Sequence, residues 1–167
     1  MPKVMHTSTD AIPPPAGRDL YEQDEHQWMA EQIAALVDGD FGRLDREHLI
    51  EYLTDTTIRD RRELRSRLTV LLLHLLKVQY QPGRLTRSAV TTILDQQREI
   101  RSIIEGIPSL GRQADDIAAA AYPDAVRQAA RETRLQRAGF PADSPWTVAM
   151  ALAFDPPEPA SRGKHHQ

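Results

Sequence analysis

The chain has 167 residues, 40% of them hydrophobic, which suits one domain with a sizeable core. It contains no cysteine, which excludes disulfides and thiolate chemistry, and its formal net charge of −3 gives no overall attraction to nucleic acid or to an anionic membrane. Because residues 1–17 lack the apolar core of a secretory signal and the run 68–78 is too short to cross a bilayer, we expect a cytoplasmic protein without a membrane segment.

The N-terminal part of the chain predicts a tail followed by two helices. Residues 1–17 include three consecutive prolines and no packed face, so we expect a flexible tail. In the first helix, Asp19 and Glu22 have the spacing of a capping box, and Gly39 lies where a left-handed C-terminal cap would end the helix. Asp45 then has the position of the next N-cap. The apolar sides expected to pack are Tyr21, Trp28, Met29, Ile33, Leu36 and Val37 in the first helix and Leu49, Ile50 and Leu53 in the second.

The strongest pattern in the chain is the apolar periodicity of residues 58–80. The positions that recur at spacings of three and four are Leu64, Leu68, Leu71, Leu75 and Val78. Further leucines make the segment 68–78 apolar almost all round, which is typical of a buried helix. We therefore expect residues 58–80 to form the central helix. Residues 55–57 are poor helix formers, so a break there and a single helix over 46–80 both remain open.

The second half of the sequence predicts several further helices. Pro82 and Gly83 should end the central helix. The expected N-caps of the helices that follow are Thr86 or Ser88, Ser109 and Ser144. Pro123 should kink or restart its helix, because it has no N–H and clashes with the preceding turn. No strand pattern appears, so the predicted fold is all-α: a single-domain bundle of about five to seven helices over residues 18–155, with a flexible tail over 156–167.

Asp24 is the polar residue that the spacing singles out. It shares a helix face with Tyr21 and Trp28, and a carboxylate on a packed face needs a partner because an unpaired buried charge is costly. We predict that Asp24 is buried at the junction of the predicted helices, bonded to an imidazole or a guanidinium. The candidate partners in this polar cluster are His48, His74 and Arg67. We interpret the cluster as a structural ion pair, because nothing else completes a catalytic set.

Metal, cofactor and phosphate sites receive little support from the sequence. Asp45, His48 and Glu51 have the helical spacing of metal ligands, but the second ligand set of a di-metal bundle is missing. We therefore expect no metal and no cofactor, and we assign no catalytic residue. A basic run points one way from the central helix at Arg61, Arg62 and Arg65. A phosphate- or RNA-binding face is one interpretation of this run, but we favour a solvated, salt-bridged helix end, because aromatic residues for stacking bases are scarce.

Four stretches of the sequence resemble a known family. They are Leu20-Tyr21-Glu22-x-Asp24-x-x-x-Trp28, Leu44-Asp45-x-x-His48-Leu49-x-Glu51, the segment from Arg61 to Pro82, and the weaker pair Tyr122-x-x-Ala125 and Pro145-Trp146-Thr147. In these stretches the chain resembles the bacterial family catalogued as domain of unknown function 29. It departs from the family pattern at His26, Tyr52 and Ser88-Ala89. The resemblance implies an all-helical single domain; it implies no activity and carries over no catalytic residues.

Together these observations favour a small non-enzymatic interaction or regulatory module, because the chain contains no complete catalytic or cofactor motif. Its expected partner is another protein, and a homodimer is one form that this would take. The alternatives are a nucleic-acid-binding protein that uses its arginine-rich helix faces, and an enzyme with an Asp/His site built from Asp24, His48 and His74.

Overall fold

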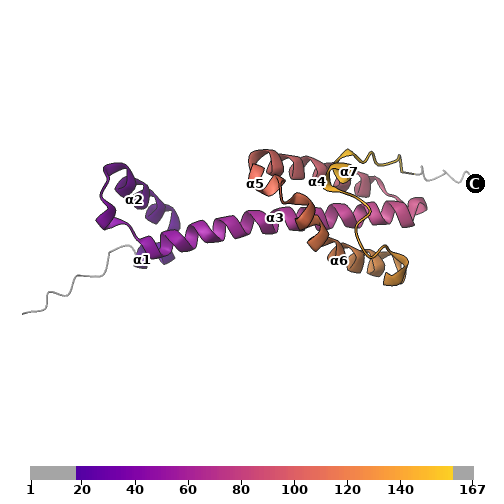
Figure 1. The fold of residues 1–167 in the computed structure, drawn as a ribbon, viewed down its shortest axis with the longest axis horizontal. Coiled ribbons are helices and arrows are strands. Elements are labelled where there is room, and N and C mark those ends of the chain that lie inside the picture. The colour runs from indigo at the N-terminus through magenta and orange to yellow at the C-terminus, as the bar shows by residue number, and fades with distance from the viewer. Residues whose placement is uncertain (1–17, 160–167) are drawn as a thin grey trace, which may run out of the picture. The chain divides into compact units, whose positions relative to one another are not determined.

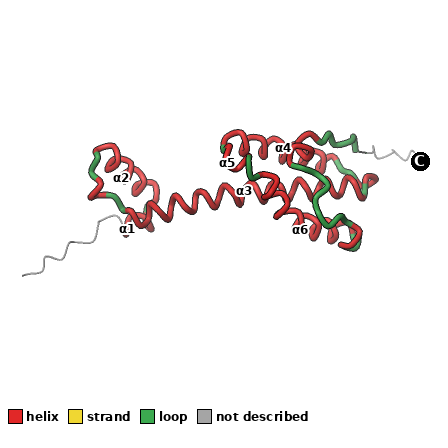
Figure 2. The backbone as a smooth tube through the Cα atoms, viewed as in Figure 1, coloured by secondary structure: helices red, strands yellow, loops and turns green. Residues whose placement is uncertain are grey.

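The computed structural model describes residues 18–159, and these residues form helices, turns and loops without a strand (Figures 1 and 2). The α-helices are α1 (Arg18–Gln23), α2 (Glu25–Asp38), α3 (Arg46–Tyr80), α4 (Arg87–Gly106), α5 (Pro108–Gly111), α6 (Ala114–Thr133) and α7 (Val148–Ala153). The 3-10 turns are η1 (Phe41–Arg43), η2 (Pro82–Arg84) and η3 (Arg137–Gly139). The all-α prediction is confirmed. The predicted N-terminal tail, and residues 160–167 of the predicted C-terminal tail, lie outside the described residues.

The chain divides between Thr57 and Ile58 into two compact units, which are described separately below. The first unit holds α1, α2, η1 and the first turns of α3, and the second holds the remainder of α3 with α4 to α7. The sequence pattern did not indicate this division. No described helix is both long enough and apolar enough to span a bilayer.

In the first unit, the helix predicted before Gly39 is two helices that meet at Asp24. The Asp24 carboxylate accepts a hydrogen bond from the Gln27 N–H at 3.0 Å and so caps α2. Gly39 ends α2 with a left-handed φ of 70°, as predicted. The predicted capping box is wrong, because α1 begins at Arg18 and Asp19 therefore lies inside the helix.

Helix α3 is continuous from Arg46 to Tyr80, which settles the alternative left open at residues 55–57. Asp45 caps it as predicted, with the His48 N–H donating to Asp45 Oδ1 at 3.4 Å. The Thr57 hydroxyl donates to the Leu53 carbonyl at 3.0 Å, which satisfies a polar side chain inside the helix. The helix ends just before Pro82, also as predicted.

The core of the second unit forms around residues 58–80 of α3, as the apolar periodicity predicts. Its largest fully buried side chains are Leu64, Leu68, Leu71, Leu72, Leu75, Leu76, Ile93, Ile100, Ile117 and Tyr122. Helix α6 faces this core with small residues, among them Ala121, Ala125 and Ala129, none of which is exposed. Small side chains let α6 approach closely, so the leucine-rich part of α3 is buried on several sides.

Three helix boundaries in the second unit differ from the predictions. Ser109 lies inside α5 and caps nothing, and α6 continues through Pro123 without a restart. Residues of α6 are buried both before and after Pro123, so the packed face of the helix continues through the proline. Thr147, not Ser144, caps α7, with the Met150 N–H donating to its hydroxyl at 3.2 Å.

Candidate functional site

The first unit contains a buried carboxylate, Asp45, that ties α2 to α3. Its side chain is 4% exposed and accepts hydrogen bonds from Trp28 Nε1 at 3.3 Å and from His48 Nδ1 at 2.6 Å. Its backbone N–H donates to Oε1 of the buried Gln32 at 2.8 Å. Because a carboxylate only accepts hydrogen bonds, the Nδ1 atom of His48 must carry a proton. Asp45 thus joins side chains from both helices through one buried group.

Aromatic rings enclose this pair. The ring of Tyr21 stacks on the His48 imidazole with a centroid distance of 4.4 Å and meets Trp28 edge-on at 4.7 Å. Tyr52, on α3, lies 5.9 Å from Trp28, and its hydroxyl contacts the Met29 sulfur at 4.0 Å. The rings shield the ion pair from water and complete the packing of α1 and α2 on α3.

The electrostatics of the pair favour an ionised Asp45. Burial by itself raises the pKa of the Asp45 carboxyl, but the hydrogen bonds from His48 and Trp28 outweigh burial and hold the pKa below its ordinary value of 3.8. The pKa of Tyr21 is raised, first by burial and then by the nearby carboxylates of Glu51 and Glu25. The carboxylate of Asp45 is enclosed, with its side chain 4% exposed, and the contacts of the Asp45–His48 pair join α2 to α3.

The polar cluster predicted around Asp24 does not form. Asp24 is exposed and caps α2, so the prediction of a buried Asp24 is wrong. The chain breaks between α1 and α2 at this residue, so the continuous helical spacing that placed Asp24 between Tyr21 and Trp28 does not apply. His48 bonds to Asp45 instead.

The other two members of the predicted cluster belong to the second unit. Arg67 bonds to Glu63 through two nitrogens, at 3.0 and 2.9 Å. His74 is partly buried, and its Nδ1 atom is buried without a hydrogen-bond partner among the described residues. Burial lowers the pKa of His74, and the adjacent Lys77 lowers it further, although Glu132 raises it in part. His74 is therefore a neutral histidine on the packed side of α3.

Two of the three residues in the predicted basic face have partners within the second unit. Arg61 Nη1 donates to Gln113 Oε1 at 2.6 Å, and Arg65 pairs with Asp124 at 2.8 Å. Arg62 is exposed and makes no ion pair in the part of the chain that the structure describes. Arg61 and Arg65 thus connect α3 to residues near and on α6, which leaves them less free to bind phosphate.

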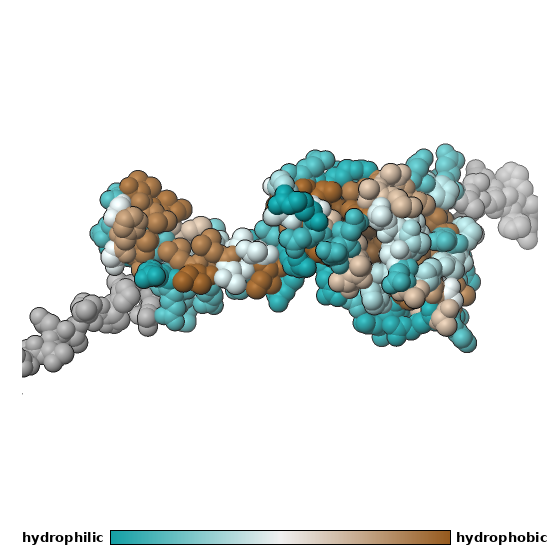
Figure 3. Space-filling model, in the orientation of Figure 1, coloured by the Kyte–Doolittle hydropathy of each residue, from teal (hydrophilic) through white to brown (hydrophobic). Residues whose placement is uncertain are grey.

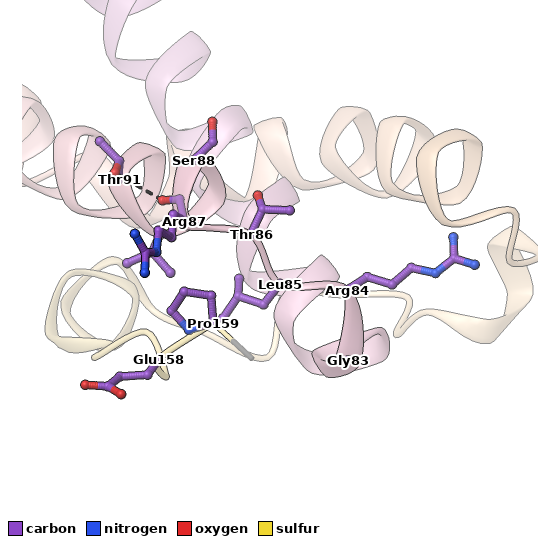
Figure 4. A pocket seen from close by; sticks show the side chains of 10 residues that line it. Gly83, Arg84, Leu85, Thr86, Arg87, Ser88, Thr91, Glu158 and Pro159 are labelled. Carbon is purple, nitrogen blue, oxygen red and sulfur yellow. Dashed lines mark hydrogen bonds between the residues drawn. The ribbon is translucent and has the colours of Figure 1, made fainter. Parts of the chain in front are cut away.

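A surface hollow lies where η2 meets α4, next to the C-terminal segment (Figure 4). Two of the hydroxyls that line it bond to the backbone: Thr86 accepts from the Ala89 N–H at 3.1 Å, and Thr91 donates to the Arg87 carbonyl at 3.1 Å. Ser88 supplies a third hydroxyl, and Glu158 supplies the one carboxylate among the lining residues. The described residues contain no group of three or more His, Cys, Asp or Glu placed to hold a metal ion.

The first unit carries an apolar surface that the packing leaves uncovered. We define this apolar face by its side chains: Ile33 (54% exposed), Leu36 (51%), Val37 (80%), Phe41 (68%), Ile50 (64%) and Leu53 (62%). In Figure 3, hydrophobic residues gather over α2 and the first turns of α3. The expectation that Ile33, Leu36, Val37, Ile50 and Leu53 pack inside the molecule is wrong, because each of them is more than half exposed.

Helical spacing explains why these side chains lie together. Ile33, Leu36 and Val37 stand three and four residues apart on α2, and Ile50 and Leu53 stand three apart on α3, so each set shares one side of its helix. Met29, one turn before Ile33, is half-buried and contacts Tyr52 of α3, which links the two stripes. The apolar face is thus a continuation of the contact between α2 and α3 onto the surface.

The two units differ in the sign of their formal net charge. Residues 18–57 contain eleven Asp and Glu against three Arg, a formal net charge of −8 with histidine neutral. Residues 58–159 contain twelve Asp and Glu against fifteen Arg and Lys, a formal net charge of +3. Nine of the acidic side chains in the first unit are exposed: Glu22, Asp24, Glu25, Glu31, Asp38, Asp40, Glu47, Glu51 and Asp55. The apolar face therefore lies on a strongly acidic unit.

Comparison with known proteins gives one match. The sequence model of the family described as "Domain of unknown function DUF29" matches residues 20–155. Neither a curated protein nor a solved structure matches the chain.

Proposed function

This chain belongs to the family of the domain of unknown function DUF29, and we propose that it is a non-enzymatic interaction module that binds another protein through its apolar face. The family description assigns no activity, so the proposal rests on the residues of this chain. The cytoplasm is the compartment that we propose for it, because a chain without cysteine suits a reducing environment.

The observation that carries the proposal is the exposure of six large apolar side chains within residues 18–57, the described part of the first unit. Together they expose on the order of 500 Å² of apolar surface, which matches the largest patch on a typical monomer, ~300–600 Å², and such a patch is often functional. Covering such a surface is favourable by roughly 25 cal/mol per Å² of apolar area. A patch of this size on so small a unit is what a protein-binding surface requires.

Charge and enclosure weigh against the two alternative functions. The first unit, with a formal net charge of −8, repels phosphate, and in the second unit two of the three arginines of the basic face, Arg61 and Arg65, already have side-chain partners. An enzymatic function of the Asp/His type would need an open pair, and the Asp45 carboxylate is enclosed.

Site-specific photo-crosslinking in the host cell tests the proposal. A photoreactive residue at Val37, which is 80% exposed, should form adducts with a second protein. The same residue at Gln27, which is also exposed on α2 but is not three or four residues from any side chain of the apolar face, should not.

A matched pair of charge variants controls the experiment. Ile50→Glu places a charge within the apolar face and should remove the adducts, whereas Gln27→Glu adds the same charge outside that face and should retain them. Equal adduct yields from Val37 and Gln27, or adducts that survive Ile50→Glu, would rule out the apolar face as the binding surface.

A further inference from the structure

Resting on the proposed function, we infer that the occupant of the apolar face is a basic amphipathic helix of the partner protein. Three features of the first unit lead to this inference: the arrangement of α2 and α3, the sign of the surrounding charge, and the two-helix thickness of the unit.

The arrangement of α2 and α3 favours a helical occupant. Contacts join Trp28 to Tyr52 and Gln32 to Asp45, so residues later in α2 meet residues earlier in α3 and the helices are antiparallel. Each presents apolar side chains three or four residues apart to solvent. A third helix fits against two such stripes if its own apolar residues recur at i, i+3, i+4 and i+7. Amphipathic helices commonly bind helical surfaces through residues at this spacing.

The thickness of the unit explains why the face is available. A helix that is apolar on two sides needs a packing partner on each side. Helix α2 is packed only on the side that carries Trp28 and Ala35. The opposite side, with Val37 80% exposed, has no covering element among residues 18–57, the described part of the first unit. A helix supplied by a partner would complete the layer.

The charge of the unit specifies the sign of that helix. Eleven carboxylates against three arginines give the first unit a formal net charge of −8, so a partner helix flanked by Lys and Arg would be attracted during encounter and stabilised at the rim. A second copy of the chain would bring another −8 against the same face. An anionic membrane surface would be repelled for the same reason. Charge complementarity therefore selects a basic helix over both.

The test uses the full chain and two designed peptides of eighteen residues that carry identical leucines at i, i+3, i+4 and i+7. In one peptide the remaining positions are Lys and Gln, and in the other they are Glu and Gln. Fluorescence anisotropy of labelled peptide should give at least tenfold tighter binding of the basic peptide, and raising the salt concentration should weaken that binding because it screens the attraction. Ile50→Glu should weaken binding at least tenfold, while Gln27→Glu, which adds the same charge outside the apolar face, should bind as the wild type does.

The outcomes separate this inference from the proposed function. Equal binding of both peptides, or no binding of either while Val37 still crosslinks to a protein in the host, would overturn the basic helix and leave the docking face in place. Loss of both the crosslink and the peptide binding would overturn the two together. Sedimentation of the chain alone tests whether a second copy occupies the face: a dimer abolished by Ile50→Glu and retained by Gln27→Glu would identify that second copy and overturn the inference. Binding to vesicles of anionic lipid that Ile50→Glu removes would likewise overturn it.

Discussion

At the scale of single residues, Asp45 has the role that the sequence pattern assigned to Asp24. The pattern predicted a buried carboxylate beside a histidine in this part of the chain, and the structure contains one, with His48 as its partner. It chose the wrong residue, because Asp45 was recognised as an N-cap and by its metal-ligand spacing with His48 and Glu51, and neither feature indicates a buried carboxylate. The contact with Trp28 joins residues seventeen positions apart, and helical spacing gives no sign of such a contact.

Asp45→Asn should destabilise the first unit by about 1–3 kcal/mol, because an amide cannot replace the charged acceptor of His48 and Trp28. Asp24→Asn is the matched control and should change stability by no more than a few tenths of a kcal/mol, since Asn caps helices as well as Asp does. Amide hydrogen exchange in α2 measures both. Equal losses of protection in the two variants would contradict the structural role given to Asp45.

The same carboxylate gives the first unit a pH dependence of known sign. The pKa of Asp45 lies below 3.8 in the folded chain, so its stabilisation is present above the ordinary pKa and is lost as the pH falls through the lowered value. The protection of α2 should therefore decrease below about pH 4 in the wild type. In Asp45→Asn this part of the decrease should be absent. Superimposable acid profiles would show that Asp45 makes no such contribution.

His74 should make the second unit weaker in mild acid. Burial and Lys77 lower the pKa of His74 from 6.5, so the unfolded chain binds a proton more readily than the folded one, and stability falls as the pH drops below 6.5. His74→Leu removes this titration and the unpartnered Nδ1 atom. The variant should melt at the same temperature or higher than the wild type at pH 5, with a smaller difference between pH 5 and pH 7.5. If the melting temperature of the variant changed more between pH 5 and pH 7.5 than that of the wild type, this role of His74 would be contradicted.

At the scale of the elements, the features that the sequence predicted correctly are those decided by local chemistry. Gly39 ends α2 because it alone adopts a left-handed φ freely there, and Thr86 begins α4 because its hydroxyl accepts the Ala89 N–H. The continuity of α3 through residues 55–57 and of α6 through Pro123 was not predictable. Both depend on a balance between weak local preferences and the packing of neighbouring turns, which a short window of sequence does not contain.

The central role of α3 in the second unit can be tested with a pair of leucines that differ in burial. Leu72→Ala should cost about 2–5 kcal/mol, because Leu72 is 1% exposed and its truncation leaves a cavity among packed side chains. Leu94→Ala, at a leucine that is 50% exposed on α4, should cost less than about 1 kcal/mol, since little buried area is lost. Urea unfolding measures the two values. Similar costs would mean that α3 is not the core of its unit.

At the scale of the whole molecule, the overall composition does not reveal the features most relevant to function. The net charge of −3 conceals an acidic first unit, and counting charge by segment would have revealed it from the sequence. The apolar face could not be recognised in the same way. Ile33 and Leu36 have the spacing of core residues, and periodicity predicts an apolar side without telling whether the covering element belongs to the same chain.

The division into two units leads to the last prediction. The core cluster of the second unit holds twenty-three buried apolar residues, whereas in the described part of the first unit the buried apolar residues are Trp28 and Ala35. A unit with so few buried side chains should open at a lower free energy than its neighbour, so amides of α2 should exchange with solvent faster than those of α6.

The variants above make this prediction specific. Asp45→Asn should lower the protection of α2 and leave α6 unchanged, while Leu72→Ala should lower the protection of α6. Parallel losses in both helices from either substitution would show that the chain opens as one cooperative body. If the units open separately, a helix bound on the apolar face should raise the protection of α2 by RT ln(1 + [L]/Kd) and leave α6 as it was, because a ligand stabilises only the unit whose folded form it binds.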